Sequence, residues 1–158
     1  MPKISLETKI NAPIERVFDL CRSVEVHVKS TSHTHERAVG GLTTGLLGLN
    51  DTVTWEATHL GVRQQLTSRI TVCNSPYFFQ DRMVSGAFQS FTHNHYFRTD
   101  KQITVVDDQF DYESPFGLIG VVFNQLVLTD YMRSFLRRRL DIVKNIAESD
   151  EWHHYLIA

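Results

Sequence analysis

The segment 51-DTVTWEATHLGVRQQLTSRITVC-73 decides the fold, because apolar and polar residues alternate along almost its whole length. Val53, Trp55 and Ala57 fall on one side of an extended chain, whereas the residues between them are Thr or Glu. Successive side chains of a β-strand point to opposite faces, so this period of two predicts strands with one buried face. Gly61 interrupts the pattern at a position suited to a turn. We therefore predict two consecutive strands, Asp51–His59 and Val62–Cys73.

The same alternation extends in both directions from this segment. It predicts further strands at Lys3–Ile10, Glu36–Val39, Tyr77–Val84, Phe88–Arg98 and Gln102–Tyr112. The links between the later strands are short, and short links favour antiparallel pairing because parallel neighbours need long crossovers. No helical segment interrupts residues 51–112, which argues against a doubly wound parallel sheet.

Helical spacing is found on both sides of this strand-rich region. Pro13 suits the first turn of a helix that continues to Cys21, and a second short helix or irregular segment spans Val24–Ser30. After Gly117 the apolar residues recur at the spacing of an amphipathic helix, which we place at about Gly120 to Glu148. The fold class is therefore α+β, with about seven strands, two short helices and a long C-terminal helix.

Length and charge set the broad class of the molecule. The chain has 158 residues and a formal net charge of −2 with neutral His, so we expect a single domain, 1–158, with its core at about 3–148. This charge favours neither nucleic acid nor an anionic membrane as a partner. The N-terminus has no apolar signal core, no apolar stretch reaches membrane-spanning length, and Cys21 and Cys73 do not form a disulfide framework. We expect a cytoplasmic protein without stable membrane insertion, monomeric or homodimeric.

The order of elements and several short motifs resemble one known superfamily. The motif Ile10-Asn11-Ala12-Pro13-Ile14-Glu15-Arg16-Val17-Phe18 is similar to the opening signature of START-like (SRPBCC) proteins. Asp51–Ala57 resembles their third strand. The motifs Phe79–Asp81, Phe91–Phe97 and Thr104–Gly117 resemble a bacterial cyclase/dehydrase-like subgroup. Members of this superfamily include the birch-pollen allergen, START lipid-transfer domains and aromatic polyketide cyclases.

This resemblance implies the helix-grip fold, in which a curved antiparallel sheet wraps the long C-terminal helix and encloses a cavity. Alternation then indicates which side chains face that cavity. We expect a mixed aromatic, aliphatic and polar lining for a small hydrophobic or aromatic ligand with one or two polar groups. The expected ligand-binding residues are Trp55, His59, Gln64, Leu66, Tyr77, Phe79, Met83, Phe91, Phe97, Val106, Phe110, Val122 and Leu126.

Four polar residues on the same expected face form a candidate catalytic cluster. His93 and His95 are two residues apart, so both project to one face of their strand. Asp81 precedes them by one strand and Asp108 follows by one, within reach of cross-strand pairs. Such a cluster can be purely structural, with each Asp and His satisfying the other's hydrogen bonds. It can also orient a ligand, act as an acid–base centre or form part of a metal site. A closed metal site needs four ligands and a catalytic one three, and we expect neither a metal nor another cofactor.

Three functions remain open from the sequence. The first is a carrier or sensor that binds a hydrophobic metabolite or lipid. The second is a cyclase, dehydratase or hydrolase that uses the Asp81, His93, His95 and Asp108 cluster. The third is an interaction module with a filled core. The Gly-rich stretch Gly40–Gly48 is interpreted as a mobile lid or partner contact, and the arginines at 133 and 137–139 as a solvated helix face.

Overall fold

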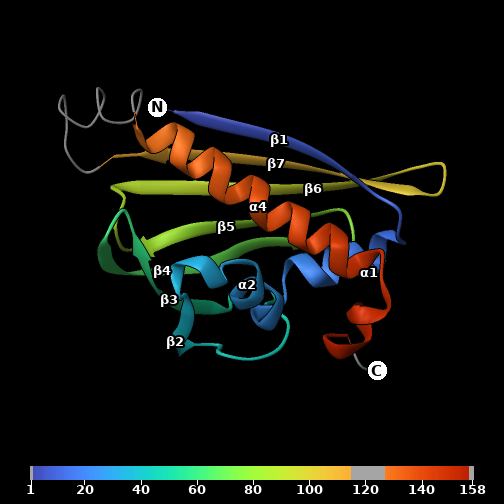
Figure 1. The fold of residues 1–158 in the computed structure, drawn as a ribbon, viewed down its shortest axis with the longest axis horizontal. Coiled ribbons are helices and arrows are strands. Elements are labelled where there is room, and N and C mark those ends of the chain that lie inside the picture. The colour runs from blue at the N-terminus through green and yellow to red at the C-terminus, as the bar shows by residue number, and fades with distance from the viewer. Residues whose placement is uncertain (1, 115–126, 157–158) are drawn as a thin grey trace.

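A computed structural model describes residues 2–114 and 127–156 of the chain (Figure 1). The predicted helix start near Gly120 and the candidate ligand-binding residues Val122 and Leu126 lie outside the described residues. The described elements are β1 (Lys3–Ile10), α1 (Ile14–Cys21), α2 (Val24–Ser30), η1 (Ser32–Thr34), β2 (Arg37–Gly41), β3 (Thr52–His59), β4 (Val62–Asn74), β5 (Phe78–Ser85), β6 (Ser90–Asp100), β7 (Ile103–Glu113), α4 (Thr129–Ala147) and η3 (Asp150–His154).

The strands form one antiparallel seven-stranded sheet in the described residues, in the order β1-β7-β6-β5-β4-β3-β2. Five consecutive hairpins build β2 to β7, and β1 then pairs with β7 so that the N-terminal strand lies at one edge. In this register Asp81 lies opposite His93, and His95 lies opposite Asp108. The predicted α+β fold and its antiparallel sheet are confirmed.

The long helix α4 runs diagonally across the concave face of the sheet (Figure 1). Its buried side chains recur at helical spacing and include Met132, Phe135, Leu136, Leu140 and Val143. The two short helices pack against the C-terminal half of α4, and Ser23 caps α2 by accepting a hydrogen bond from the Val26 N–H. No helix among the described residues is both long and apolar enough to cross a membrane.

Helix α1 fills one end of the space between the sheet and α4. The fully buried ring of Phe18 makes edge contacts with Phe79 and Phe97, at centroid distances of 5.5 and 5.1 Å. Val106 is completely buried in the same hydrophobic core. Phe79, Phe97 and Val106 therefore face inward as predicted but pack in the core, because α1 occupies the space that a ligand would need there.

Two further expectations differ from the structure. Tyr77 is 58% exposed, because β5 begins at Phe78 and Tyr77 still belongs to the turn, where its N–H donates to the Asn74 carbonyl. The Gly40–Gly48 stretch is tied to the α1–α2 junction by hydrogen bonds from Val24 N–H to the Gly45 carbonyl and from Leu47 N–H to the Arg22 carbonyl. It lies away from the cavity described below, which argues against a lid.

Replacing Phe18 with Ala should lower the free energy of unfolding by about 3–5 kcal/mol, because a buried aromatic side chain is removed from a close-packed core. Tyr77→Ala is the matched control, and this exposed ring should change stability by about 0.5 kcal/mol or less. Urea denaturation measures both variants. Equal losses in the two would contradict the assignment of this end of the fold as the packed core.

Candidate functional site

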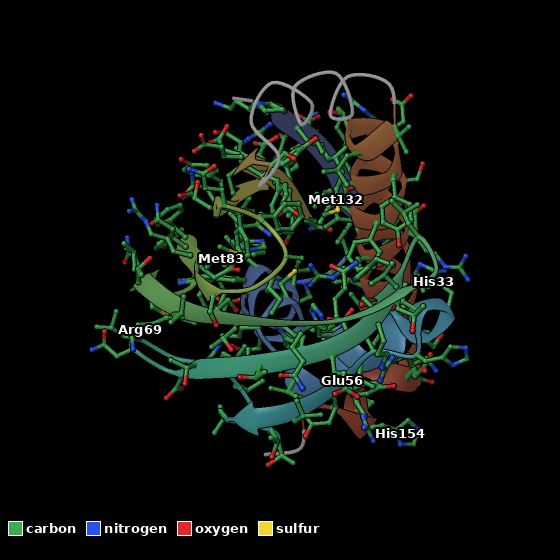
Figure 2. The ribbon with its side chains drawn as sticks, turned by 90° about the vertical axis from the view of Figure 1, so that its left-hand side faces the viewer. His33, Glu56, Arg69, Met83, Met132 and His154 are labelled. Atoms are coloured by element: carbon green, nitrogen blue, oxygen red, sulfur yellow. The ribbon has the colours of Figure 1, made fainter. Side chains whose placement is uncertain are left out.

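A cavity of about 730 Å³ lies at the other end of the space between the sheet and α4. Figure 2 looks into this interior, with Met83 on the sheet side and Met132 on α4, whereas Arg69 and His154 lie at the periphery. Most lining residues are apolar. They come from β3, β4, β6, β7, α4 and the link between β5 and β6, and include Trp55, Ala57, Leu66, Phe88, Phe91, Phe110, Tyr131, Met132, Phe135 and Leu136.

Six of the predicted ligand-binding residues line this cavity: Trp55, His59, Gln64, Leu66, Phe91 and Phe110. Met83 is half-buried against the core but is not part of the lining. Of the predicted catalytic residues, Asp81 and His93 face the cavity, whereas His95 and Asp108 lie buried behind them. Alternation identified the inward face, but it could not show which half of that face the short helices cover.

The mouth of the cavity has an apolar rim. Leu60 and Val62 at the β3–β4 turn and Val127 before α4 all line the cavity, yet they are 51%, 57% and 41% exposed. Beside them the His59 ring forms a hydrogen bond with the Tyr131 hydroxyl, with 2.7 Å between Nδ1 and the oxygen. Exposed apolar side chains that border a pocket are typical of an entrance for an apolar molecule.

The four predicted polar residues meet in one cluster across β5, β6 and β7. His95 lies between two carboxylates, with Nδ1 2.9 Å from Asp108 Oδ1 and Nε2 2.9 Å from Asp81 Oδ1. His93 Nε2 is 3.3 Å from Asp108 Oδ2, outside hydrogen-bond geometry, and its Nδ1 is 4.0 Å from Asp81 Oδ1. The sequence prediction that these residues lie together is confirmed by the geometry, whereas any catalytic role stays a prediction.

This cluster stands at the boundary between the packed core and the cavity. The His95 ring stacks on Phe79 of the core with 4.1 Å between centroids. The His93 ring meets the edge of Phe110, a cavity residue, at 5.2 Å. The two imidazoles are themselves 3.8 Å apart. Groups on the cavity side of the cluster are therefore held in place by groups that the core fixes.

Burial and neighbouring charge act in opposite directions on these groups. Burial disfavours the protonated form of His95, but the Asp108 and Asp81 carboxylates outweigh it and raise the pKa to about 9. Burial together with the charge of His95 lowers the pKa of His93. Burial would raise the pKa of both aspartates, but the two histidines hold each below its ordinary value. At neutral pH the arrangement is one imidazolium, one neutral imidazole and two carboxylates.

A second polar group lines the cavity and was missed from the sequence. His27 of α2 stacks on Trp55 with 3.8 Å between centroids, and its Nε2 is 2.7 Å from Glu36 Oε1. Burial lowers the pKa of His27, so the ring is neutral and donates to Glu36. Burial opposes ionisation of Glu36, yet His27 and Arg139 lower its pKa. His27 lies in helix α2, outside any predicted strand. Glu36 begins the predicted strand Glu36–Val39 but precedes β2, which starts at Arg37, so alternation did not indicate that its side chain lines the cavity.

Arg139 also lines the cavity, which corrects its interpretation as part of a solvated helix face. Its position carried a signal: it follows Leu136 by three residues and precedes Val143 by four, so it falls on the buried stripe of α4. The cluster of neighbouring arginines in the sequence hid this spacing. Its charge is close enough to lower the pKa of both Glu36 and Asp81.

Four buried side-chain polar atoms in the described part of the chain have no hydrogen-bond partner there. They are Glu36 Oε2, His93 Nε2, Ser114 Oγ and Arg139 Nε. All four residues line the same cavity. A buried polar group without a partner costs about 1–3 kcal/mol, so such groups are normally satisfied by water or a ligand. The wall of the cavity therefore contains polar residues with unused hydrogen-bonding capacity as well as apolar surface.

Comparisons with solved structures show that the chain has a helix-grip fold. Protein TTHA0849 from Thermus thermophilus is similar, with a TM-score of 0.75, 18% identity, and coverage of 91% of this chain and 95% of that one. Major latex-like protein 151 from Panax ginseng gives 0.69 and 14%, with 94% and 98% covered. Protein CV1439 from Chromobacterium violaceum gives 0.70 and 9%, with 95% and 100% covered. No family model and no curated protein matches the sequence.

Replacing His27 with Ala should lower the free energy of unfolding by about 2–3 kcal/mol, because the buried Glu36 carboxylate loses its donor. Trp55 also loses its stacking partner, so its fluorescence should change. His154→Ala, at an exposed position, is the control and should leave both readouts close to wild type. Denaturant unfolding followed by tryptophan emission makes the test; a His27→Ala protein as stable as wild type would contradict the pairing.

Proposed function

We propose that this protein binds a small, largely apolar or aromatic molecule in its internal cavity and acts as a carrier or sensor for it. The observation that carries the proposal is the cavity of about 730 Å³, which has an apolar rim and four lining residues that each carry a buried polar atom without a partner among the described residues. Ligand pockets in proteins measure about 300–1,000 Å³, so this volume suits a drug-sized molecule. The cavity argues against an interaction module with a filled core.

The walls indicate how such a molecule would be held. Phe88, Phe91 and Phe110 form a group of mutually contacting rings, with centroids 5.2–6.1 Å apart. Rings of this kind offer apolar surface and edge or face contacts to an aromatic or polycyclic ligand. Burial of apolar ligand surface against them supplies the main driving force, at about 25 cal/mol per Å².

The polar wall favours a particular kind of ligand head group. Glu36 Oε2 is an acceptor and Arg139 Nε a donor, and neither atom has a hydrogen-bond partner among the described residues. A neutral group that both donates and accepts, such as a hydroxyl, phenol or carboxamide, satisfies both atoms. A ligand carboxylate would bring a second negative charge toward Glu36, which is already ionised. We infer an amphipathic ligand with an apolar body and an uncharged polar end.

Native mass spectrometry of protein purified from its own host tests this proposal directly. A co-purifying small molecule should appear as a discrete added mass that is lost under denaturing conditions. Its mass would define the ligand class. Purified protein that carries no added mass and binds no apolar probe would overturn the proposal.

Ala57→Phe should weaken binding of N-phenylnaphthylamine at least tenfold, because the new ring occupies the cavity that Ala57 lines. At about 0.3 kcal/mol per heavy atom, this probe should bind wild type with a Kd at or below roughly 0.2 mM. Fluorescence titration measures both proteins. Val84→Phe adds the same ring at a position 52% exposed and outside the lining, and should bind like wild type.

Acid–base catalysis in the same cavity is the second candidate function. The observation that favours it is that His93 is neutral, faces the cavity and adjoins the Asp81 carboxylate, which also faces it. A neutral imidazole can accept a proton from a bound molecule, and such transfers contribute about 10²–10⁴-fold to rates. This arrangement suits a cyclase, dehydratase or hydrolase.

If the protein is such an enzyme, His93→Gln should reduce turnover by about 10²–10⁴-fold while cavity binding of N-phenylnaphthylamine stays within a few-fold. Incubation with a soluble metabolite extract of the host, followed by mass spectrometry, identifies masses that wild type consumes. His154→Gln serves as the control for handling and purity. Equal consumption by wild type and His93→Gln would remove His93 from the chemistry and leave the carrier function.

A further inference from the structure

The cavity side of the Asp–His cluster brings together three side chains that can bind a metal ion. One ligand atom from each of Asp81, His93 and His95 lies within 4.8 Å of the other two. The closest pair is His95 Nε2 and Asp81 Oδ1 at 2.9 Å, and His93 Nδ1 is 4.0 Å from the same oxygen. Ligand atoms around a metal at about 2.0–2.2 Å must lie a little over 3 Å apart, so small side-chain movements bring the three atoms into place. Binding also releases the proton that His95 Nε2 donates to Asp81 in the metal-free protein, and this proton passes to solvent.

The orientation of the two imidazole rings adds an independent observation. Asp108 turns one oxygen to each ring: Oδ1 is 2.9 Å from His95 Nδ1, and Oδ2 is 3.3 Å from His93 Nε2. Each ring therefore directs one nitrogen at Asp108 and the other toward Asp81. Metal-binding histidines nearly always have their second ring nitrogen held by a carboxylate, a carbonyl or water. Here the buried Asp108 carboxylate holds the second nitrogen of His95 by a hydrogen bond and lies 3.3 Å from the second nitrogen of His93, outside hydrogen-bond geometry.

We propose that Asp81, His93 and His95 form a binding site for a divalent transition-metal ion, with Asp108 positioning the two imidazoles. Three protein ligands leave coordination positions free, as in catalytic rather than structural metal sites. Because Asp81 and His93 line the cavity, the free positions face the space where a small molecule would bind. The site would thus join an oxygen or nitrogen of that molecule to the protein.

The ligand set restricts the ion. Two imidazoles and one carboxylate suit Zn²⁺, Fe²⁺, Co²⁺ or Ni²⁺, whereas Ca²⁺ and Mg²⁺ prefer sets made entirely of oxygen. The strands that carry the three ligands are hydrogen-bonded neighbours, so the backbone positions are fixed before the ion arrives. This inference concerns the cluster alone and holds whether or not a hydrophobic ligand fills the remainder of the cavity.

Co²⁺ is the probe of choice, because its visible d–d absorption reports both stoichiometry and coordination. Protein stripped with a chelator should bind one equivalent of Co²⁺ and show the intense bands of a four- or five-coordinate ion. Asp81→Asn and His93→Gln should each abolish that spectrum or weaken binding at least 100-fold. Circular dichroism melts should show both variants folded, and either variant alone is sufficient for the test.

The chain offers a matched control in its exposed C-terminal histidines. His153 and His154 are adjacent and solvent-exposed, so they are the main competing chelators. A His153→Gln/His154→Gln variant should keep the full Co²⁺ spectrum. Wild type without a one-equivalent spectrum would overturn the proposal. So would a spectrum that persists unchanged in a folded Asp81→Asn or His93→Gln protein, or its loss in the tail variant.

Discussion

The architecture depends on an unequal filling of the space between the concave sheet and α4. Helix α1 inserts Phe18 against Phe79 and Phe97 at one end, which closes that end as an ordinary hydrophobic core. At the other end the described chain offers no comparable insert, and the sheet and helix remain apart around the cavity. The packed end contributes buried hydrophobic contacts, and the other end holds the cavity. A larger residue at Ala57 would fill part of the cavity and make its end of the fold resemble the packed end.

The polar cluster of Asp81, His93, His95 and Asp108 lies between the packed end and the cavity. This position explains why some of its side chains contact the core and others line the cavity. On one side His95 is stacked on the core ring of Phe79; on the other, His93 and Asp81 face the cavity. The buried carboxylate of Asp108 connects the two sides, since it approaches both imidazoles. Rigid packing thereby fixes the orientation of groups that face open space, which is the usual requirement for a binding or reactive site.

Much of the fold could be predicted from the sequence, because the period of two in residues 51–112 and the helical stripe after Gly117 are strong local signals. The register that joins Asp81, His93, His95 and Asp108 also followed from alternation on consecutive strands. The prediction that Tyr77 faces the cavity was wrong, because alternation does not show at which residue a strand begins. His27, Glu36 and Arg139 were missed for different reasons. His27 lies in a short helix, and Glu36 precedes β2 although the predicted strand began with it. Arg139 was grouped by charge although its spacing places it on the buried stripe. Tertiary placement of the short helices decides which inward residues meet a ligand, and no local pattern encodes it.

The chain of contacts Asp81–His95–Asp108 constrains which substitutions this sequence can accept during evolution. The two ends are largely buried carboxylates that share the single positive charge of His95, so loss of His95 leaves both without their nearest counter-charge and loss of either aspartate removes a partner of His95. Breaking such a buried pair costs about 3–5 kcal/mol, a large part of the stability of an ordinary domain. Single substitutions are therefore heavily penalised, and descendants should either keep the whole set or have replaced it together, so that the residues at 81, 95 and 108 co-vary as one inherited unit.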